Sequence, residues 1–260
     1  MLEAKFTEAS LLKKIIDSFK DSVELVNFVC DENGIEAQAV DDSRVLLVAL
    51  KIGADLFEEY RCDRGITLGL NLTSLAKILR CGNNTDNLTL IAEDEPDSLL
   101  ILFEDVKKEK MSEYSLKLVN IDADMLKIDD MKYDCLVEMP SVEFAKTVRD
   151  LNQLSDSFTA IVTKDTIKFV ADGEIGSGSV ILKPNVNLDK PEDKIVVELE
   201  KPVDLTFSSK YLLDIVKASG LSMAITLKLA VDAPALFEFK LNNTNGFLSF
   251  FLAPKFNDEE

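Results

Sequence analysis

Residues 66–80, ITLGLNLTSLAKILR, join a strand-like apolar segment to a short segment with helical spacing. Leu72 and Leu75 lie three residues apart, which places them on one face of a helix, whereas Lys77 and Arg80 fall on the opposite face. The stretch therefore predicts a strand followed directly by a helix that buries its leucines and exposes its cations.

A second stretch, residues 203–217 (VDLTFSSKYLLDIVK), repeats this order of strand and helix 137 positions further along the chain. At this offset Leu75 aligns with Leu212, and Arg80 aligns with Lys217. A supersecondary unit that is used twice in one chain produces such a repeat. The sequence therefore predicts two copies of one domain.

Short segments rich in β-branched and aromatic residues fill most of the remaining chain, and turn dipeptides such as Asn33-Gly34 separate them, which is typical of antiparallel hairpins. We expect strands at 23–30, 34–40, 44–51, 66–70, 87–92, 99–103, 112–118, 135–139, 158–163, 166–171, 179–182, 194–199, 203–207, 224–229, 236–240 and 247–252. Helical spacing is confined to 10–20, 72–80, 141–153 and 209–217. The predicted fold is therefore α+β, with antiparallel sheets and two helices in each of two domains. Their predicted limits are 1–118 and 135–260, with a long acidic connector at 119–134.

Charge is distributed differently in the predicted helices and in the rest of the chain. The whole sequence has a net charge of −18, yet the four predicted helices contain nine basic and four acidic residues. The basic ones lie opposite the apolar stripes: Lys13, Lys14, Lys20, Lys77, Arg80, Lys146, Arg149, Lys210 and Lys217. A solvated face is the alternative for any one amphipathic helix. Four such faces in an acidic chain indicate a cationic surface that binds phosphates without reading base sequence.

Residue types that common enzyme mechanisms need are missing from the sequence. It has no histidine, which removes the commonest general base. The glycine-rich run at 173–179 lacks the Lys-Ser/Thr of a phosphate loop, and the acidic runs at 41–42 and 93–95 lack EF-hand spacing. We therefore expect a hairpin turn at the first run and solvated turns at the other two. A hydrolase that uses paired carboxylates is the alternative from the enzyme class.

The cysteines and the apolar runs indicate the compartment. The chain has no CxxC pair, so we expect reduced, partly buried thiols at Cys30, Cys62, Cys81 and Cys135. Residues 1–6 lack the charge order of a signal peptide, and no apolar run reaches the roughly 18 residues that a membrane span requires. We expect a protein that stays inside the cell and does not bind membranes.

Several runs of residues, taken together, are more specific than any single motif. They are Asp41-Asp42-Ser43-Arg44-Val45, Leu72-Thr73-Ser74-Leu75-Ala76-Lys77-Ile78-Leu79-Arg80, Phe169-Val170-Ala171-Asp172-Gly173, Gly176-Ser177-Gly178, Tyr211-Leu212-Leu213-Asp214 and Leu252-Ala253-Pro254-Lys255. On these runs the chain closely resembles, along essentially its whole length, the family of proliferating cell nuclear antigen, the eukaryotic sliding clamps, in its fungal type. The resemblance implies the DNA-clamp fold and a closed homotrimeric ring with all helices lining the hole. It implies a processivity factor that encircles duplex DNA and has no catalytic site, cofactor or metal.

The same resemblance implies roles for particular residues. The nine helical cations would face DNA together with Lys110, and Tyr114 and Gly178 would lie in the subunit interface. Partner peptides would enter a hydrophobic pocket formed by Val40, Arg44, Val45, Leu47, Leu126, Ile128, Pro234, Phe251, Ala253 and Pro254. Ordinary core packing is the alternative for its apolar members. Lys164 matches the family's ubiquitin and SUMO acceptor, and Lys127 matches a second SUMO site.

The resemblance also implies a set of partners and a location in the nucleus. The expected partners are two further copies of the chain, duplex DNA, DNA polymerases, the clamp loader, flap endonuclease, DNA ligase and other PIP-box proteins. A subunit of a heterotrimeric checkpoint clamp is the nearest alternative, and a mass measurement separates the two because only the first is a homotrimer. A histone-binding acidic chaperone is a further alternative.

Overall fold

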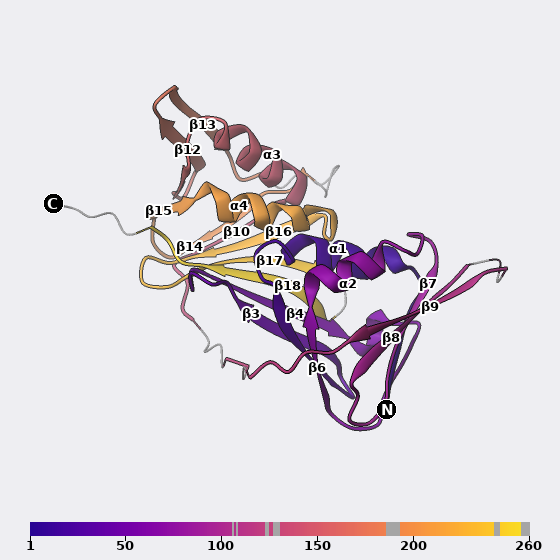
Figure 1. The fold of residues 1–260 in the computed structure, drawn as a ribbon. Coiled ribbons are helices and arrows are strands. Elements are labelled where there is room, and N and C mark those ends of the chain that lie inside the picture. The colour runs from indigo at the N-terminus through magenta and orange to yellow at the C-terminus, as the bar shows by residue number, and fades with distance from the viewer. Residues whose placement is uncertain are drawn as a thin grey trace. The chain divides into compact units, whose positions relative to one another are not determined.

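The computed structural model of the chain (Figure 1) describes residues 1–105, 107, 109–122, 125–126, 131–185, 193–241 and 245–255. The chain divides into two units. Unit 1 comprises Met1–Asp42, Val48–Leu126 and Lys240–Leu248, and unit 2 comprises Ser43–Leu47, Lys127–Phe239 and Ser249–Glu260. None of the helices in the described ranges combines the length and the apolar character needed to cross a bilayer.

Unit 1 is built on antiparallel strands. One sheet has the order β5-β1-β7-β8-β9, and a second run of neighbouring strands has the order β3-β2-β6. Their bounds are β1 (Leu2–Phe6), β2 (Leu25–Asp31), β3 (Gly34–Val40), β5 (Glu59–Cys62), β6 (Ile66–Asn71), β7 (Asn87–Ala92), β8 (Ser98–Glu104) and β9 (Met111–Lys117). Buried residues alternate with half-buried ones along β7 and β8, as a sheet with one face on the core requires.

Two helices of unit 1, α1 (Ala9–Phe19) and α2 (Leu72–Leu79), contact one another. Helix α2 begins where β6 ends because the Asn71 side chain caps it, with Oδ1 accepting the Ser74 N–H at 2.9 Å. Both helices bury the apolar stripe and turn the other face away from the core. A short 3₁₀ helix, η1 (Ala54–Leu56), lies just before β5 in the chain.

Unit 2 repeats this plan. One sheet has the order β13-β12-β11-β15, and a second run has the order β14-β10-β16-β17. The bounds are β10 (Cys135–Pro140), β11 (Ser157–Val162), β12 (Ile167–Gly173), β13 (Gly176–Leu182), β14 (Val196–Leu199), β15 (Val203–Ser208), β16 (Ala224–Leu229) and β17 (Ala235–Leu241). Its helices are α3 (Ser141–Asn152) and α4 (Ser209–Ile215), and η3 (Val216–Gly220) follows α4 directly. Three strands contain residues of both units: β17, whose last two residues belong to unit 1, and two further strands, β4 (Leu46–Gly53) and β18 (Gly246–Leu252).

An aromatic cluster joins α3 to the strands of unit 2. The ring centroid of Phe144 lies 5.8 Å from that of Phe169 on β12 and 5.9 Å from that of Phe237 on β17. All three side chains are buried, and truncation of such a residue to alanine costs about 3–5 kcal/mol. The cluster fixes the inner face of α3 and leaves the opposite face for other contacts.

The structure confirms most of the predicted elements and corrects some. Antiparallel pairing in both units, as between β7 and β8 and between β11 and β12, and two α-helices in each unit confirm the α+β prediction. The run at 173–179 is the predicted turn, since Gly173 pairs with Gly176 between β12 and β13. The helix predicted at 209–217 is wrong in its last turn, because the chain tightens into η3 at Val216. Strands β1 and β5 are present although no strand is predicted there.

Candidate functional site

The cations on α1 and α2 lie on the faces that turn away from the core of unit 1. Lys14, Lys77 and Arg80 are exposed, whereas Leu12 and Leu75 on the opposite faces are buried. Within the described part of the chain, Lys14 and Lys77 form no ion pair. Their charges are therefore available to a ligand.

Two other predicted cations, Lys13 on α1 and Lys20 directly after it, are already engaged. The Nζ of Lys13 donates to the Gly82 carbonyl at 2.7 Å and to Asn84 Oδ1 at 3.1 Å. Lys20 pairs with Asp21 at 2.9 Å and is only half-buried, with its ammonium also 3.7 Å from Asp17. A shallow hollow beside α1 is lined by Ser10, Lys13, Lys14, Asp17, Arg80, Gly82, Asn83 and Asn84. Lys13 thus fastens the 82–84 loop to α1 instead of standing free at the surface.

Unit 2 presents a second group of helical cations. Lys146 and Arg149 on α3 and Lys210 on α4 are exposed, and the Lys210 ammonium lies 5.8 Å from the centre of the Tyr211 ring. Lys217 pairs with Asp214 at 2.6 Å. Lys110, which precedes β9 in unit 1, is exposed as well. All ten predicted cations therefore reach the surface of their own unit at least in part.

Each unit has a sheet that ends in an exposed strand. Strand β9 is the last strand of its sheet in unit 1, and β13 is the last strand of its sheet in unit 2. Tyr114 on β9 is half-buried, with its ring 5.9 Å from that of Phe103 on β8. Gly178 on β13 lies close to the end of α3, because a Cβ at this position would be 3.5 Å from the Leu151 side chain in α3 and 2.6 Å from that of Leu154, just after the helix. Terminal strands have unpaired backbone groups that can accept another strand.

The predicted pocket residues differ in exposure. In unit 1, Val40 and Leu126 are exposed, the latter to 54%. The members in unit 2 are exposed at Arg44, buried at Phe251 and half-buried at Val45, Leu47, Pro234, Ala253 and Pro254. Arg44 has a φ of 58°, a left-handed conformation that is uncommon for residues other than glycine. Ile128 lies outside the described residues.

The connector is held to unit 1 by contacts that sequence analysis misses. The Val119 N–H donates to the Gly69 carbonyl at 2.9 Å, and Asn27 Nδ2 donates to the Ile121 carbonyl at 3.1 Å. The Leu126 N–H donates to Gln38 Oε1 at 2.8 Å. Sequence patterns do not reveal these contacts, because the side chains of Gln38 and Asn27 bond to residues that lie 88 and 94 positions away.

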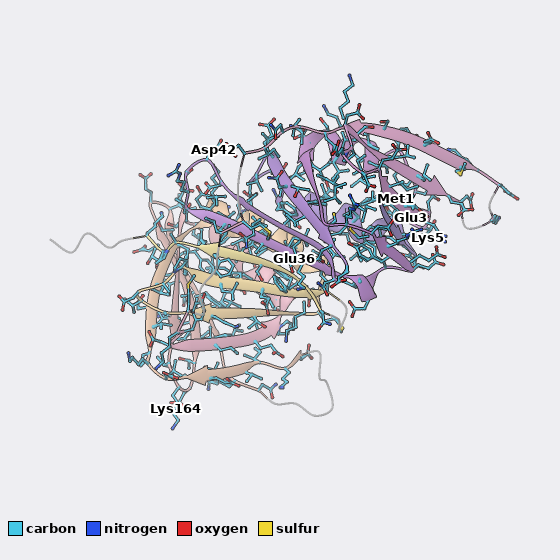
Figure 2. All side chains as sticks on the ribbon, turned by 90° about the horizontal axis from the view of Figure 1, so that it is seen from below. Met1, Glu3, Lys5, Glu36, Asp42 and Lys164 are labelled. Atoms are coloured by element: carbon cyan, nitrogen blue, oxygen red, sulfur yellow. The ribbon has the colours of Figure 1, made fainter. Side chains whose placement is uncertain are left out.

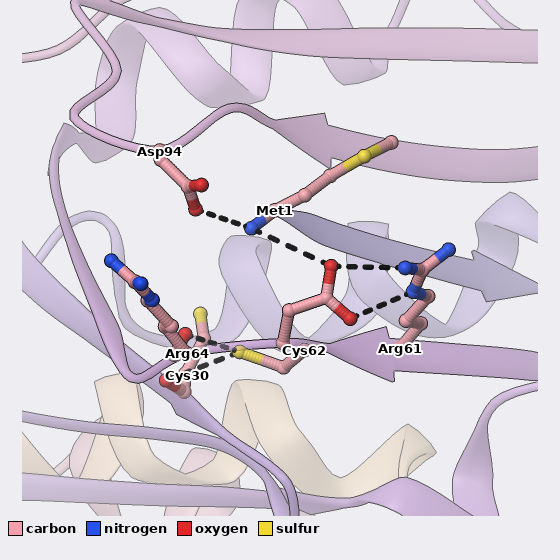
Figure 3. Close-up of polar contacts among 7 residues, drawn as sticks. Met1, Cys30, Arg61, Cys62, Arg64 and Asp94 are labelled. Carbon is pink, nitrogen blue, oxygen red and sulfur yellow. Dashed lines mark hydrogen bonds and ion pairs between the residues drawn. The ribbon is translucent and has the colours of Figure 1, made fainter.

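Among the described residues, the acidic runs at 41–42 and 93–95 do not form a metal site. Asp41 is buried, which corrects the expectation of a solvated side chain there, whereas Asp42 is exposed in a turn as expected. Asp94 is exposed as well and ion-pairs with the Met1 amino group (Figure 3). The described ranges contain no group of three or more acidic or cysteine side chains placed to hold an ion.

The four cysteines are free thiols in different surroundings. Cys30 and Cys135 are buried, and burial raises the pKa of Cys30 to about 12 and that of Cys135 to about 11. The structure brings Cys62 beside Cys30, with its Sγ 3.6 Å from the Cys30 carbonyl oxygen (Figure 3). Cys81 is exposed, so the expectation of a partly buried thiol is wrong there.

Lys164 projects from the turn between β11 and β12 into solvent (Figure 2). Among the described residues its side chain has no ion-pair or hydrogen-bond partner. Lys127 lies outside the described residues.

Comparison with known proteins covers the whole chain. The model of the proliferating cell nuclear antigen N-terminal domain matches residues 1–127, and that of the C-terminal domain matches residues 127–256. The proliferating cell nuclear antigen of Saccharomyces cerevisiae is 65% identical over 260 residues, which are 100% of each chain. That of Chaetomium thermophilum is 46% identical over the same share of both chains.

Proposed function

The chain belongs to the family of proliferating cell nuclear antigen, the eukaryotic sliding clamps, and from this premise we propose that three identical copies close into a ring around duplex DNA. Sliding clamps are processivity factors in DNA replication and repair, and they hold other proteins on DNA without catalysing a reaction. The observation that carries the proposal is the gathering of exposed cations on the helical faces of a chain with a net charge of −18.

Ring closure would use the two terminal strands. We propose that β9 of one copy pairs with β13 of the next, with Tyr114 and Gly178 inside the contact. Met111 and Ile181 are 68% and 56% exposed on these strands, so a partner strand would cover apolar surface as well as backbone groups. Because the two surfaces differ, the contact is head to tail, and it generates a ring when the rotation closes after three copies.

The helical cations would contact phosphates along the hole of this ring. Lys14, Lys77, Lys146, Arg149 and Lys210 have the most available charges, while Lys20, Arg80, Lys110 and Lys217 would add to the field. Contacts between flexible ammonium groups and phosphates have no preferred register, so they permit sliding. Retention then comes from the closed ring, and the acidic exterior disfavours DNA binding on the other faces.

A charge-removal experiment tests the cationic surface. The double variant Lys146→Gln, Arg149→Gln is compared with Lys168→Gln, Lys228→Gln, which removes the same charge from β12 and β16. For the first variant we expect weaker DNA binding and a slope of log K against log salt that is smaller by about 0.9 for each phosphate that the protein no longer neutralises. Equal affinity and equal slope in the two variants would contradict the proposal.

A second part of the proposal concerns partner peptides. By family likeness, we propose that PIP-box peptides of polymerases, flap endonuclease, DNA ligase and other partners dock on Val40, Arg44, Val45, Leu47, Leu126, Ile128, Pro234, Phe251, Ala253 and Pro254. Exposed Leu126 supports it, since an aliphatic side chain at the surface of an acidic connector offers an apolar contact. The variant Leu126→Asp should bind such a peptide at least tenfold more weakly, by about 1.4 kcal/mol or more.

Modification, location and domain limits complete the proposal. We propose Lys164 as an acceptor of ubiquitin and SUMO and Lys127 as a second SUMO acceptor, in a nuclear protein that is loaded by the clamp loader. The exposure of Lys164 at a turn supports its access to a conjugating enzyme.

The proposed domains remain 1–118 and 135–260, with the connector at 119–134.

A further inference from the structure

Three residues of unit 1 form a row across neighbouring strands. In the strand register, Gln38 on β3 is directly opposite Asn27 on β2, and Asn27 is directly opposite Gly69 on β6. Directly opposed residues of antiparallel strands point to the same face of the sheet. The Gln38–Asn27–Gly69 row therefore crosses the three strands on one face.

The connector follows this row step by step. Val119 bonds to Gly69 on β6, Ile121 bonds to Asn27 on β2, and Leu126 bonds to Gln38 on β3. The order of the contacts along the connector is the order of the strands in the sheet. The described connector residues thus run across the strands and meet one member of the row at each strand.

Glycine at position 69 permits the first of these contacts. A Cβ at this position would overlap the carbonyl oxygen of Val119, and backbone cannot yield as the end of a flexible side chain can. The close approach of the connector to β6 therefore requires the absence of a side chain.

The last contact holds the backbone of Leu126 but leaves the side chain of this residue exposed. Its N–H is bonded to Gln38, yet the residue is 54% exposed. A segment that is already ordered loses less conformational entropy when a ligand binds, so its affinity is higher. We infer that the Gln38–Asn27–Gly69 row fixes the connector and that Gln38 is a positioning residue, which presents the Leu126 side chain to partner peptides. The inference rests on the proposed docking function.

Two substitutions at Gln38 test the inference in the full-length protein. Gln38→Met keeps the side-chain length but removes the acceptor, whereas Gln38→Glu retains an acceptor oxygen. With a fluorescein-labelled synthetic PIP-box peptide, Gln38→Met should raise Kd about fivefold, as the absence of one hydrogen bond predicts, and Gln38→Glu should stay within about twofold of the wild type. Hydrogen exchange at the Leu126 amide should be faster in Gln38→Met only, and DNA binding should not change.

Leu126→Asp is the reference that separates the two proposals. If this variant binds the peptide as the wild type does, the docking function itself is wrong. If Leu126→Asp weakens binding while Gln38→Met leaves both Kd and Leu126 exchange unchanged, the docking function stands and the row has no positioning role. A Gln38→Glu variant as weak as Gln38→Met would also overturn the inference, because the retained acceptor would then be irrelevant.

Discussion

The cations that face away from the core are not equivalent residues. Helical phase predicts that Lys13 and Lys14 are both exposed, and the structure shows that Lys13 instead bonds to Gly82 and Asn84. The Gly82 carbonyl lies 69 positions away in the sequence, so a helical pattern could not reveal the bond. Local periodicity predicts which face a side chain occupies, but long-range folding decides whether its charge remains available.

Substituting each of these lysines by methionine should separate stability from DNA binding. Lys13→Met should lower the free energy of unfolding by about 1–2 kcal/mol, since it leaves the Gly82 carbonyl without its donor. Lys14→Met should leave stability nearly unchanged and reduce the salt dependence of DNA binding. Urea unfolding and DNA titrations at several salt concentrations measure both effects, and equal stability of the two variants would contradict the assignment of Lys13.

The cysteines should differ in their reaction with iodoacetamide. The thiolate is the reactive form, and burial raises the pKa of Cys30 and Cys135 far above neutral pH. At pH 7.5, a value we take as about one unit below the ordinary thiol pKa, both should stay unmodified in the folded protein. Mass spectrometry of peptides identifies the modified residues, and unfolding in urea provides the control in which all four react. Native reaction of Cys30 at the unfolded rate would contradict the buried assignment.

At the scale of helices and strands, the predictions were accurate where a pattern is regular. Strands β3, β7 and β16 have the predicted limits, because turn residues or a helix border each of them. Strand β5 was missed because Glu59 to Cys62 is short and half charged, and its place in the sheet depends on pairing with β1. Strand β1 alternates Leu2, Ala4 and Phe6 with charged residues, so its period could have been recognised.

The terminal strand β13 provides a test of subunit contact. Ile181→Asp places a charge on a side chain that is already exposed within one chain, so the fold should tolerate it, whereas a buried subunit contact should not. We expect a monomer by light scattering, with unchanged circular dichroism. Val231→Asp introduces the same charge at a residue that is 60% exposed outside β13, and it should remain a trimer. A trimeric Ile181→Asp variant would exclude β13 from the interface.

At the scale of the whole molecule, sequence runs such as 72–80 predicted the family, and the comparisons confirm it. Net charge alone would have excluded DNA, since a chain at −18 repels phosphates on average. The clustering of cations on four helices reversed that conclusion. The ring itself could not be derived from one chain, because closure depends on surfaces that meet only between copies.

Retention on circular DNA tests the ring most directly. The protein is loaded onto nicked circular duplex, the complex is isolated at moderate salt, and half of the sample is then linearised with a restriction enzyme. A closed ring held by topology should remain on the circle and slide off the free ends after cutting. Equal retention on circular and linear DNA, or loss from both at the same rate, would contradict encirclement.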